Sequence, residues 1–197
     1  MDRKINLAKA TLINIPRTGR IGRFIKILEG QVDEISLLHI VEGSQNYNAL
    51  KSNQKAQWWQ GTIERMEAAL GKEKSVFIMT ACGAKCCGNG QRKTAKKLMG
   101  ESNSIEELLS KLSVHEVKDG ELEYKLIDKS TIVARHNRCF CGQVKYATQL
   151  HETDTYCQCS VEFNRQFFMA ALNKPVDVKL NKSILNGDDI CEFIISI

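Results

Sequence analysis

The stretch that decides the fold covers residues 156–197 and reads YCQCSVEFNRQFFMAALNKPVDVKLNKSILNGDDICEFIISI. Its first part has apolar residues at helical spacing: Phe163, Phe167 and Ala171. Ser160 is placed as the cap of this helix, and Pro175 ends it. Apolar residues then alternate with polar ones over 176–180, and again over 191–197 after an Asn-Gly turn. The pattern predicts a helix followed by a β-hairpin.

Two more strands are predicted upstream of this helix. Leu122, Tyr124 and Leu126 alternate with charged neighbours, and 130–135 reads as their partner strand. The C-terminal part is therefore an antiparallel meander with one inserted helix.

Helical patterns dominate the N-terminal half. An apolar stripe ends at Gly71, and its members are Trp59, Ile63, Met66 and Leu70. Residues 74–87 read as a second helix, and Ser104 with Glu107 has the spacing of a capping box. We expect an α+β fold in a single domain, 1–197. Residues 1–115 are expected to be mainly helical, and residues 120–197 to form the α+β core. The helices of 1–115 then cover the antiparallel sheet of that core.

Composition excludes several classes of protein. Hydrophobic residues make up 43% and charged residues 26%, and the net charge of +5 is too small to indicate nucleic-acid binding. No stretch approaches the roughly 18 apolar residues of a membrane span. The first residues lack the apolar core of a secretory signal, so we expect a cytoplasmic protein with reduced thiols.

Seven of the eight cysteines fall into three groups: Cys82-x3-Cys86-Cys87, Cys139-x-Cys141 and Cys157-x-Cys159. In a helix, the side chains of Cys82 and Cys86 share one face, whereas in an extended segment residues two apart share one side. Thiolates are ligands for soft metals. We therefore predict a shared site that binds a metal, zinc, through ligands drawn from Cys82, Cys86, Cys141, Cys157 and Cys159. Disulfides, and a thiol nucleophile with His136 or His151 as its base, are the alternatives.

A cationic run, Arg135, His136 and Arg138, directly precedes the Cys139 pair. Beside a pocket these side chains would bind an anionic ligand such as a carboxylate. A solvated strand edge is the alternative.

The C-terminal stretch also resembles a known family, the small-molecule-binding domain named after bacteriochlorophyll 4-vinyl reductase. The resemblance depends on Cys157, Phe163, Phe167-Phe168, Pro175-Val176-x-Val178 and Gly187-Asp188-x2-Cys191-x-Phe193. The chain is closer still to an uncharacterised bacterial family related to that domain, which has Tyr-Cys-x-Cys-Ser before the helix.

The resemblance implies a small organic ligand and a homodimer. Members of that family that sense aromatic compounds bind zinc through four positions, which correspond here to Cys157, Leu180, Ser183 and Cys191. Leucine and serine do not replace a thiolate or carboxylate ligand, so a zinc site here would have to recruit other cysteines.

The sequence thus predicts a cytoplasmic small-molecule-binding protein with a cysteine-thiolate zinc site. A hydrolase that uses metal-activated water or a cysteine nucleophile is an alternative, and a thiol-redox sensor is another. Whether the protein is an enzyme stays open at this point.

Overall fold

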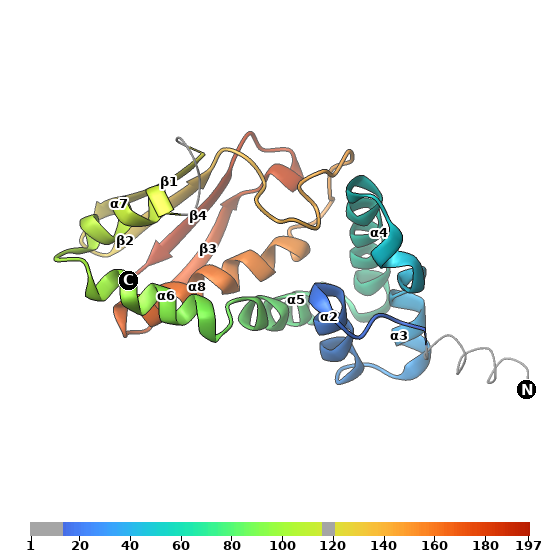
Figure 1. Cartoon of the computed structure of the whole chain (residues 1–197). Coiled ribbons are helices and arrows are strands. Elements are labelled where there is room, and N and C mark those ends of the chain that lie inside the picture. The colour runs from blue at the N-terminus through green and yellow to red at the C-terminus, as the bar shows by residue number, and fades with distance from the viewer. Residues whose placement is uncertain (1–13, 116–120) are drawn as a thin grey trace, which may run out of the picture.

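The computed structural model describes residues 14–115 and 121–197. Within these ranges the chain forms seven α-helices and one four-stranded sheet (Figure 1). The helices are α2 (Gly19–Glu29), α3 (Glu34–Ile40), α4 (Ser52–Leu70), α5 (Lys72–Cys86), α6 (Asn89–Gly100), α7 (Ile105–His115) and α8 (Gln158–Leu172). The strands are β1 (Leu122–Asp128), β2 (Thr131–His136), β3 (Asp177–Lys182) and β4 (Cys191–Ser196).

The sheet has the strand order β1-β2-β4-β3, and each neighbouring pair is antiparallel. In this register His136 lies opposite Leu122 on one side and opposite Cys191 on the other. These three residues therefore share one end of the sheet. The α+β prediction, with an antiparallel sheet, an inserted helix and a C-terminal hairpin, is confirmed. The strands do not follow chain order as in a simple meander, because β4 lies between β2 and β3.

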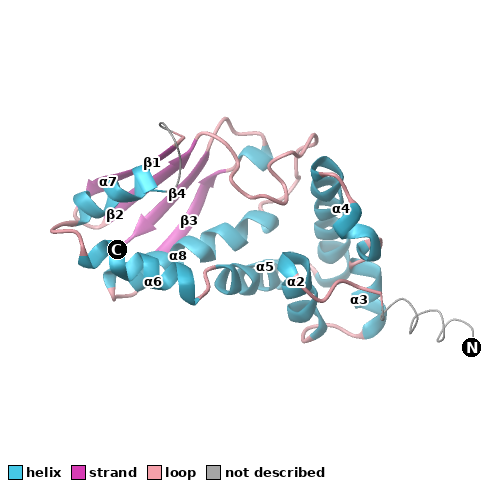
Figure 2. Ribbon diagram, viewed as in Figure 1, coloured by secondary structure: helices cyan, strands magenta, loops and turns pink. Residues whose placement is uncertain are grey.

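Helices cover one face of the sheet (Figure 2). A buried cluster joins the inward residues of β2 and β4, such as Ile132 and Ile195, to Phe167 and Phe168 of α8. Leu108 and Leu112 of α7 complete this cluster from the N-terminal half of the chain. Burial of these side chains is the main force that holds α7 and α8 on the sheet.

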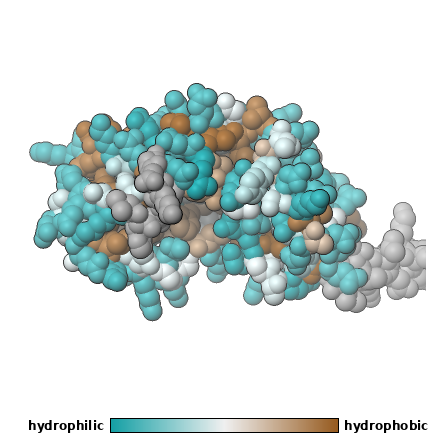
Figure 3. All heavy atoms as spheres, turned by 45° about the horizontal axis from the view of Figure 1, so that its top comes forward, coloured by the Kyte–Doolittle hydropathy of each residue, from teal (hydrophilic) through white to brown (hydrophobic). Residues whose placement is uncertain are grey.

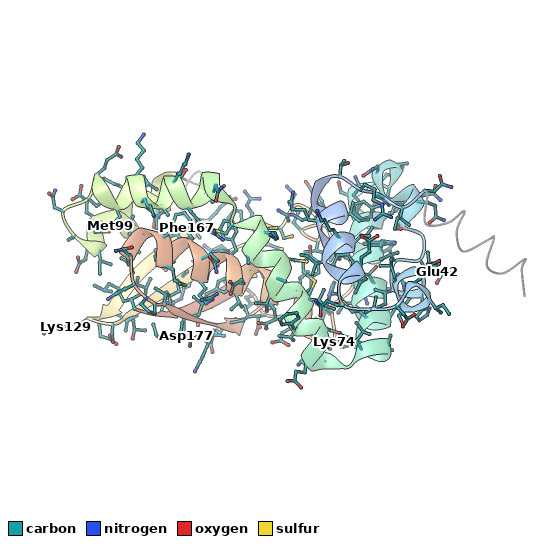
Figure 4. The ribbon with its side chains drawn as sticks, turned by 90° about the horizontal axis from the view of Figure 1, so that it is seen from below. Glu42, Lys74, Met99, Lys129, Phe167 and Asp177 are labelled. Carbon is teal, nitrogen blue, oxygen red and sulfur yellow. The ribbon has the colours of Figure 1, made fainter. Side chains whose placement is uncertain are left out.

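A second buried cluster lies among the N-terminal helices. It contains the predicted stripe of Trp59, Ile63 and Met66 on α4, together with Phe24 of α2 and Ile78 of α5. Seen from below, α2 to α4 form one half of the molecule and the sheet with its helices forms the other (Figure 4). Helix α5 links them.

Helix α5 crosses α8 at Gly83. A Cβ atom on Gly83 would lie 2.3 Å from the carbonyl oxygen of Cys159 and 2.8 Å from the Cβ of Glu162. Only glycine fits at this crossing, and the close approach brings the cysteines of α5 next to the start of α8.

Two local predictions about α8 were wrong. The helix begins at Gln158 rather than after a cap at Ser160, and a short 3-10 helix, η2 (Thr155–Cys157), precedes it. Cys157 and Cys159 therefore lie on helical backbone and not on an extended segment. Among the described residues, no helix is long and apolar enough to cross a membrane.

Candidate ligand-binding site

A cavity of about 380 Å³ lies where the end of the sheet meets the start of α8. Helices α2 and α5 and the loop 137–154 complete its wall. The lining is predominantly aromatic and aliphatic, and its apolar members are Leu122, Tyr124, Phe140, Val144, Tyr156, Phe163, Leu185 and Phe193. A concave, mainly apolar cavity of this size with a few polar groups is typical of small-molecule sites.

Six cysteines line this one cavity: Cys86, Cys139, Cys141, Cys157, Cys159 and Cys191. Cys82 lines a small adjoining cavity together with Cys86 and Cys159. The structure thus brings the five candidate metal ligands to two neighbouring cavities, while Cys87 packs in the cluster beneath the sheet.

The thiols do not form a metal-binding geometry. Within 14–115 and 121–197, no three His, Cys, Asp or Glu side chains are placed so that they could hold one ion. Cys157 instead contacts the hydroxyl of Ser183 at 3.3 Å, and the sulfur of Cys191 accepts the backbone N–H of Ile184 at 3.5 Å. All eight cysteines are free thiols. Zinc binding stays a prediction.

Cys141 has a different environment from the other thiols. Its sulfur accepts a hydrogen bond from the Arg20 guanidinium at 3.2 Å and lies 3.2 Å from the hydroxyl oxygen of Tyr156. A guanidinium can only donate, so this contact stabilises negative charge on the sulfur.

The neighbouring thiols are held protonated by burial. Burial raises the pKa of Cys139 to about 11 and that of Cys157 to about 12. It also raises the pKa of Cys159 well above its ordinary value and raises that of Cys191. These four thiols are therefore neutral at physiological pH and act as weakly polar parts of the wall.

The three residues of the cationic run separate in space. His136 lines the cavity, with its ring against Phe140 and Phe193. Its Nε2 atom is buried without a hydrogen-bond partner, and burial lowers the pKa of His136 to about 4, so the ring is neutral. Outside the lining, Arg135 pairs with Glu192 at 2.7 Å and Arg138 with Glu121 at 2.7 Å.

The loop 137–154 is anchored to α4 from the side away from the sheet (Figure 2). The hydroxyl of Tyr47 donates to Gln143, and Trp59 donates to the Tyr47 oxygen at 2.9 Å. At the other end of the loop, Thr153 and Thr155 both donate to the carboxylate of Glu67. The bond between Tyr47 and Gln143 holds the part of the loop that carries Cys141, two residues away.

Arg20 and Tyr156 are the two functional residues that sequence reasoning missed. Arg20 is 121 positions from the cysteine that it contacts, so sequence proximity gives no sign of the pair. The available signal is the apolar spacing of Ile21, Phe24 and Leu28, which indicates a buried helix face beside Arg20. Tyr156 adjoins the Cys-x-Cys group and could have been included with it.

Figure 3 shows a face of the molecule on which hydrophilic side chains predominate and hydrophobic ones emerge in separate patches.

Comparison with known proteins gives few matches. A search of curated proteins finds none. Among solved structures, an H-NOX protein from S. oneidensis in the Fe(II)NO ligation state is similar at a TM-score of 0.39 and 13% identity, over 88% of this chain and 97% of that chain. A likeness of this size assigns no ligand to the present chain. Residues 24–197 match the family described as "Family of unknown function (DUF6144)", and the chain belongs to that family.

Proposed function

We propose that this protein binds a small organic molecule with a flat, mainly apolar body and one anionic or strongly polar group. The observation that carries the proposal is the cavity of about 380 Å³, whose wall combines aromatic rings with a single guanidinium. Its volume is within the range of ligand pockets, roughly 300 to 1,000 Å³.

The apolar part of the ligand is placed by the aromatic residues. Phe140 comes from the loop, Phe163 from α8 and Phe193 from β4, so rings from three elements face one space. Aromatic walls favour a flat ligand, because ring faces and edges both contribute contact area.

The polar part of the ligand is placed by Arg20. Its guanidinium has five N–H donors and uses one nitrogen, NH1, on the sulfur of Cys141, so others stay available to a ligand oxygen. Arg135 and Arg138 are engaged with Glu192 and Glu121, and this supports Arg20 as the recognition residue for a carboxylate.

Two fluorescent probes test this proposal. The first is 1-anilinonaphthalene-8-sulfonate, which is anionic, and the second is N-phenyl-1-naphthylamine, which lacks the sulfonate. Both should bind and fluoresce. Arg20→Gln should weaken binding of the sulfonate by roughly tenfold, the scale of a charge-assisted hydrogen bond, and leave the neutral probe unchanged.

Matched variants separate the cavity from the surface. Ser160 lines the cavity, so Ser160→Phe should weaken both probes, whereas Ser110→Phe on the exposed face of α7 should weaken neither. Lys26→Gln removes a cation from α2 outside the cavity and should have no effect. Unchanged affinity for both probes in Ser160→Phe would refute the proposal.

Zinc is a separate question about the same thiols. The five candidate cysteines lie around two adjoining cavities, but their present arrangement does not fit a single ion. Elemental analysis of the purified protein tests this: zinc that is lost in Cys141→Ser and Cys157→Ser would support a site formed by rearrangement. Protein free of metal would remove the zinc prediction. The cytoplasmic location and the homodimer also stay predictions.

A further inference from the structure

We infer that Cys141 is a nucleophile that forms a covalent adduct with an α,β-unsaturated carbonyl compound held in the cavity. The inference rests on the proposed function and deepens it, because it names the chemical class of ligand for the same site. It depends on the contacts of Cys141, on the state of the neighbouring thiols and on the nature of the cavity wall.

Two polar side chains contact the sulfur of Cys141. Arg20 NH1 donates to its Sγ at 3.2 Å, and the Tyr156 hydroxyl lies 3.2 Å away on the same sulfur. The thiolate is the reactive form of cysteine, and a neighbouring arginine favours it. Tyr156 is 3% exposed, and burial raises its pKa well above the ordinary value, so its hydroxyl keeps its proton and can donate it in a hydrogen bond.

The surrounding thiols lack such contacts. Cys157 faces the Ser183 hydroxyl, and Cys191 faces a backbone N–H, and burial keeps both in the neutral form. Cys86 also lines the cavity and comes from the end of α5. Among the described residues that line the cavity, Cys141 is the thiol that accepts a hydrogen bond from a cationic side chain, and this contact distinguishes it from the others.

Addition fits this site better than hydrolysis. Cysteine hydrolases pair the sulfur with a base that is itself oriented, usually a histidine. Here the Nε2 atom of His136 has no hydrogen-bond partner, so it is not joined to any thiol. Addition to an activated alkene needs no such base once the sulfur is ionised, and it has no leaving group.

The step balances without a co-reactant. A bond forms between Sγ of Cys141 and the β-carbon of the ligand, and the carbon–carbon π bond breaks. Its electron pair moves to the carbonyl oxygen, where the Arg20 guanidinium can stabilise the enolate. A proton then reaches the α-carbon from water and replaces the one that the thiol gave to water when it ionised. The product is a thioether whose mass is that of protein plus ligand.

The test uses benzylideneacetone, a flat aromatic enone, and its saturated analogue 4-phenylbutan-2-one. Intact-protein mass spectrometry should show addition of one whole enone molecule and none of the analogue. Peptide mapping of the wild-type protein should place the adduct on Cys141. Cys141→Ser should abolish the adduct, whereas Cys87→Ala, which changes a thiol in the cluster beneath the sheet, should leave it unchanged.

Arg20 has a positioning role that kinetics can separate from binding. Arg20→Gln should lower the limiting rate of adduct formation at saturating enone by roughly tenfold or more. The control Lys26→Gln should not change this rate. An adduct that maps to another cysteine, or no adduct in a protein that binds both fluorescent probes, would overturn the inference and leave the proposed function intact. Failure to bind the probes would instead refute the proposed function.

Discussion

Gly83→Ala should destabilise the protein, because this glycine permits the contact between α5 and α8. The added methyl carbon would lie 2.3 Å from the Cys159 carbonyl oxygen and 3.0 Å from its carbonyl carbon. Both atoms belong to backbone, so the clash is relieved only if one helix moves. Overpacking of this kind costs about 1 to 3 kcal/mol, against a gain of about 1 kcal/mol in helix propensity.

The expected net change lowers the free energy of unfolding by up to about 2 kcal/mol. For a chain of this size that corresponds to a fall in melting temperature of roughly 4 to 8 °C. Thermal unfolding followed by circular dichroism measures it. Gly90→Ala is the matched control, because Gly90 lies in α6 and a Cβ there would meet nothing within 4 Å.

The clash also affects the site. Movement of α5 away from α8 would separate Cys86 from Cys159, which line the same cavity. Gly83→Ala should therefore weaken binding of both fluorescent probes, whereas Gly90→Ala should not. A Gly83→Ala protein as stable as the Gly90→Ala variant, which has the same gain in helix propensity but no clash, would refute the account of this crossing.

Two further predictions concern the loop and His136. Glu67→Ala should lower the free energy of unfolding by about 1 to 3 kcal/mol, because it leaves the buried Thr155 hydroxyl without its acceptor. Glu67→Gln keeps an acceptor oxygen and should cost less. Chemical denaturation measures both changes. Equal losses in the two variants would contradict the role assigned to that bond. Burial lowers the pKa of His136 to about 4, below the value of about 6.5 expected in the unfolded chain, so the unfolded state binds the proton first. Stability should therefore be complete above about pH 6.5 and fall by up to about 3 kcal/mol as the pH drops to about 4, and the loss should be smaller in His136→Phe. Burial also lowers the pKa of His151, so part of the loss of stability at low pH should persist in His136→Phe. If His136→Phe had the same pH dependence of stability as the wild type, His136 would not be buried in the neutral form.

Local patterns predicted the elements of this fold well. The segments with alternating residues, 122–126 and 191–197, form strands β1 and β4 of one antiparallel sheet, and the stripe that begins at Trp59 is buried. At the start of α7 the Ser104 hydroxyl accepts the backbone N–H of Glu107, as the capping pattern indicated. Glu107 in turn accepts the backbone N–H of Asn103 rather than that of Ser104.

The site was harder to predict because its parts come from distant segments. Spacing within one cysteine group can predict which side chains share a helix face, as with Cys82 and Cys86. The partner of Cys141 is Arg20, and only the tertiary fold brings α2 and the loop 137–154 together. The charges of Arg135 and Arg138 could not be placed from sequence either, because their carboxylate partners lie on β4 and just before β1.

A crystal structure of the protein with 1-anilinonaphthalene-8-sulfonate tests the central claim most directly. We expect the probe's rings between Phe140, Phe163 and Phe193, with the sulfonate against the Arg20 guanidinium. A probe bound only outside this cavity, with the space beside Cys141 filled by protein side chains, would contradict the account.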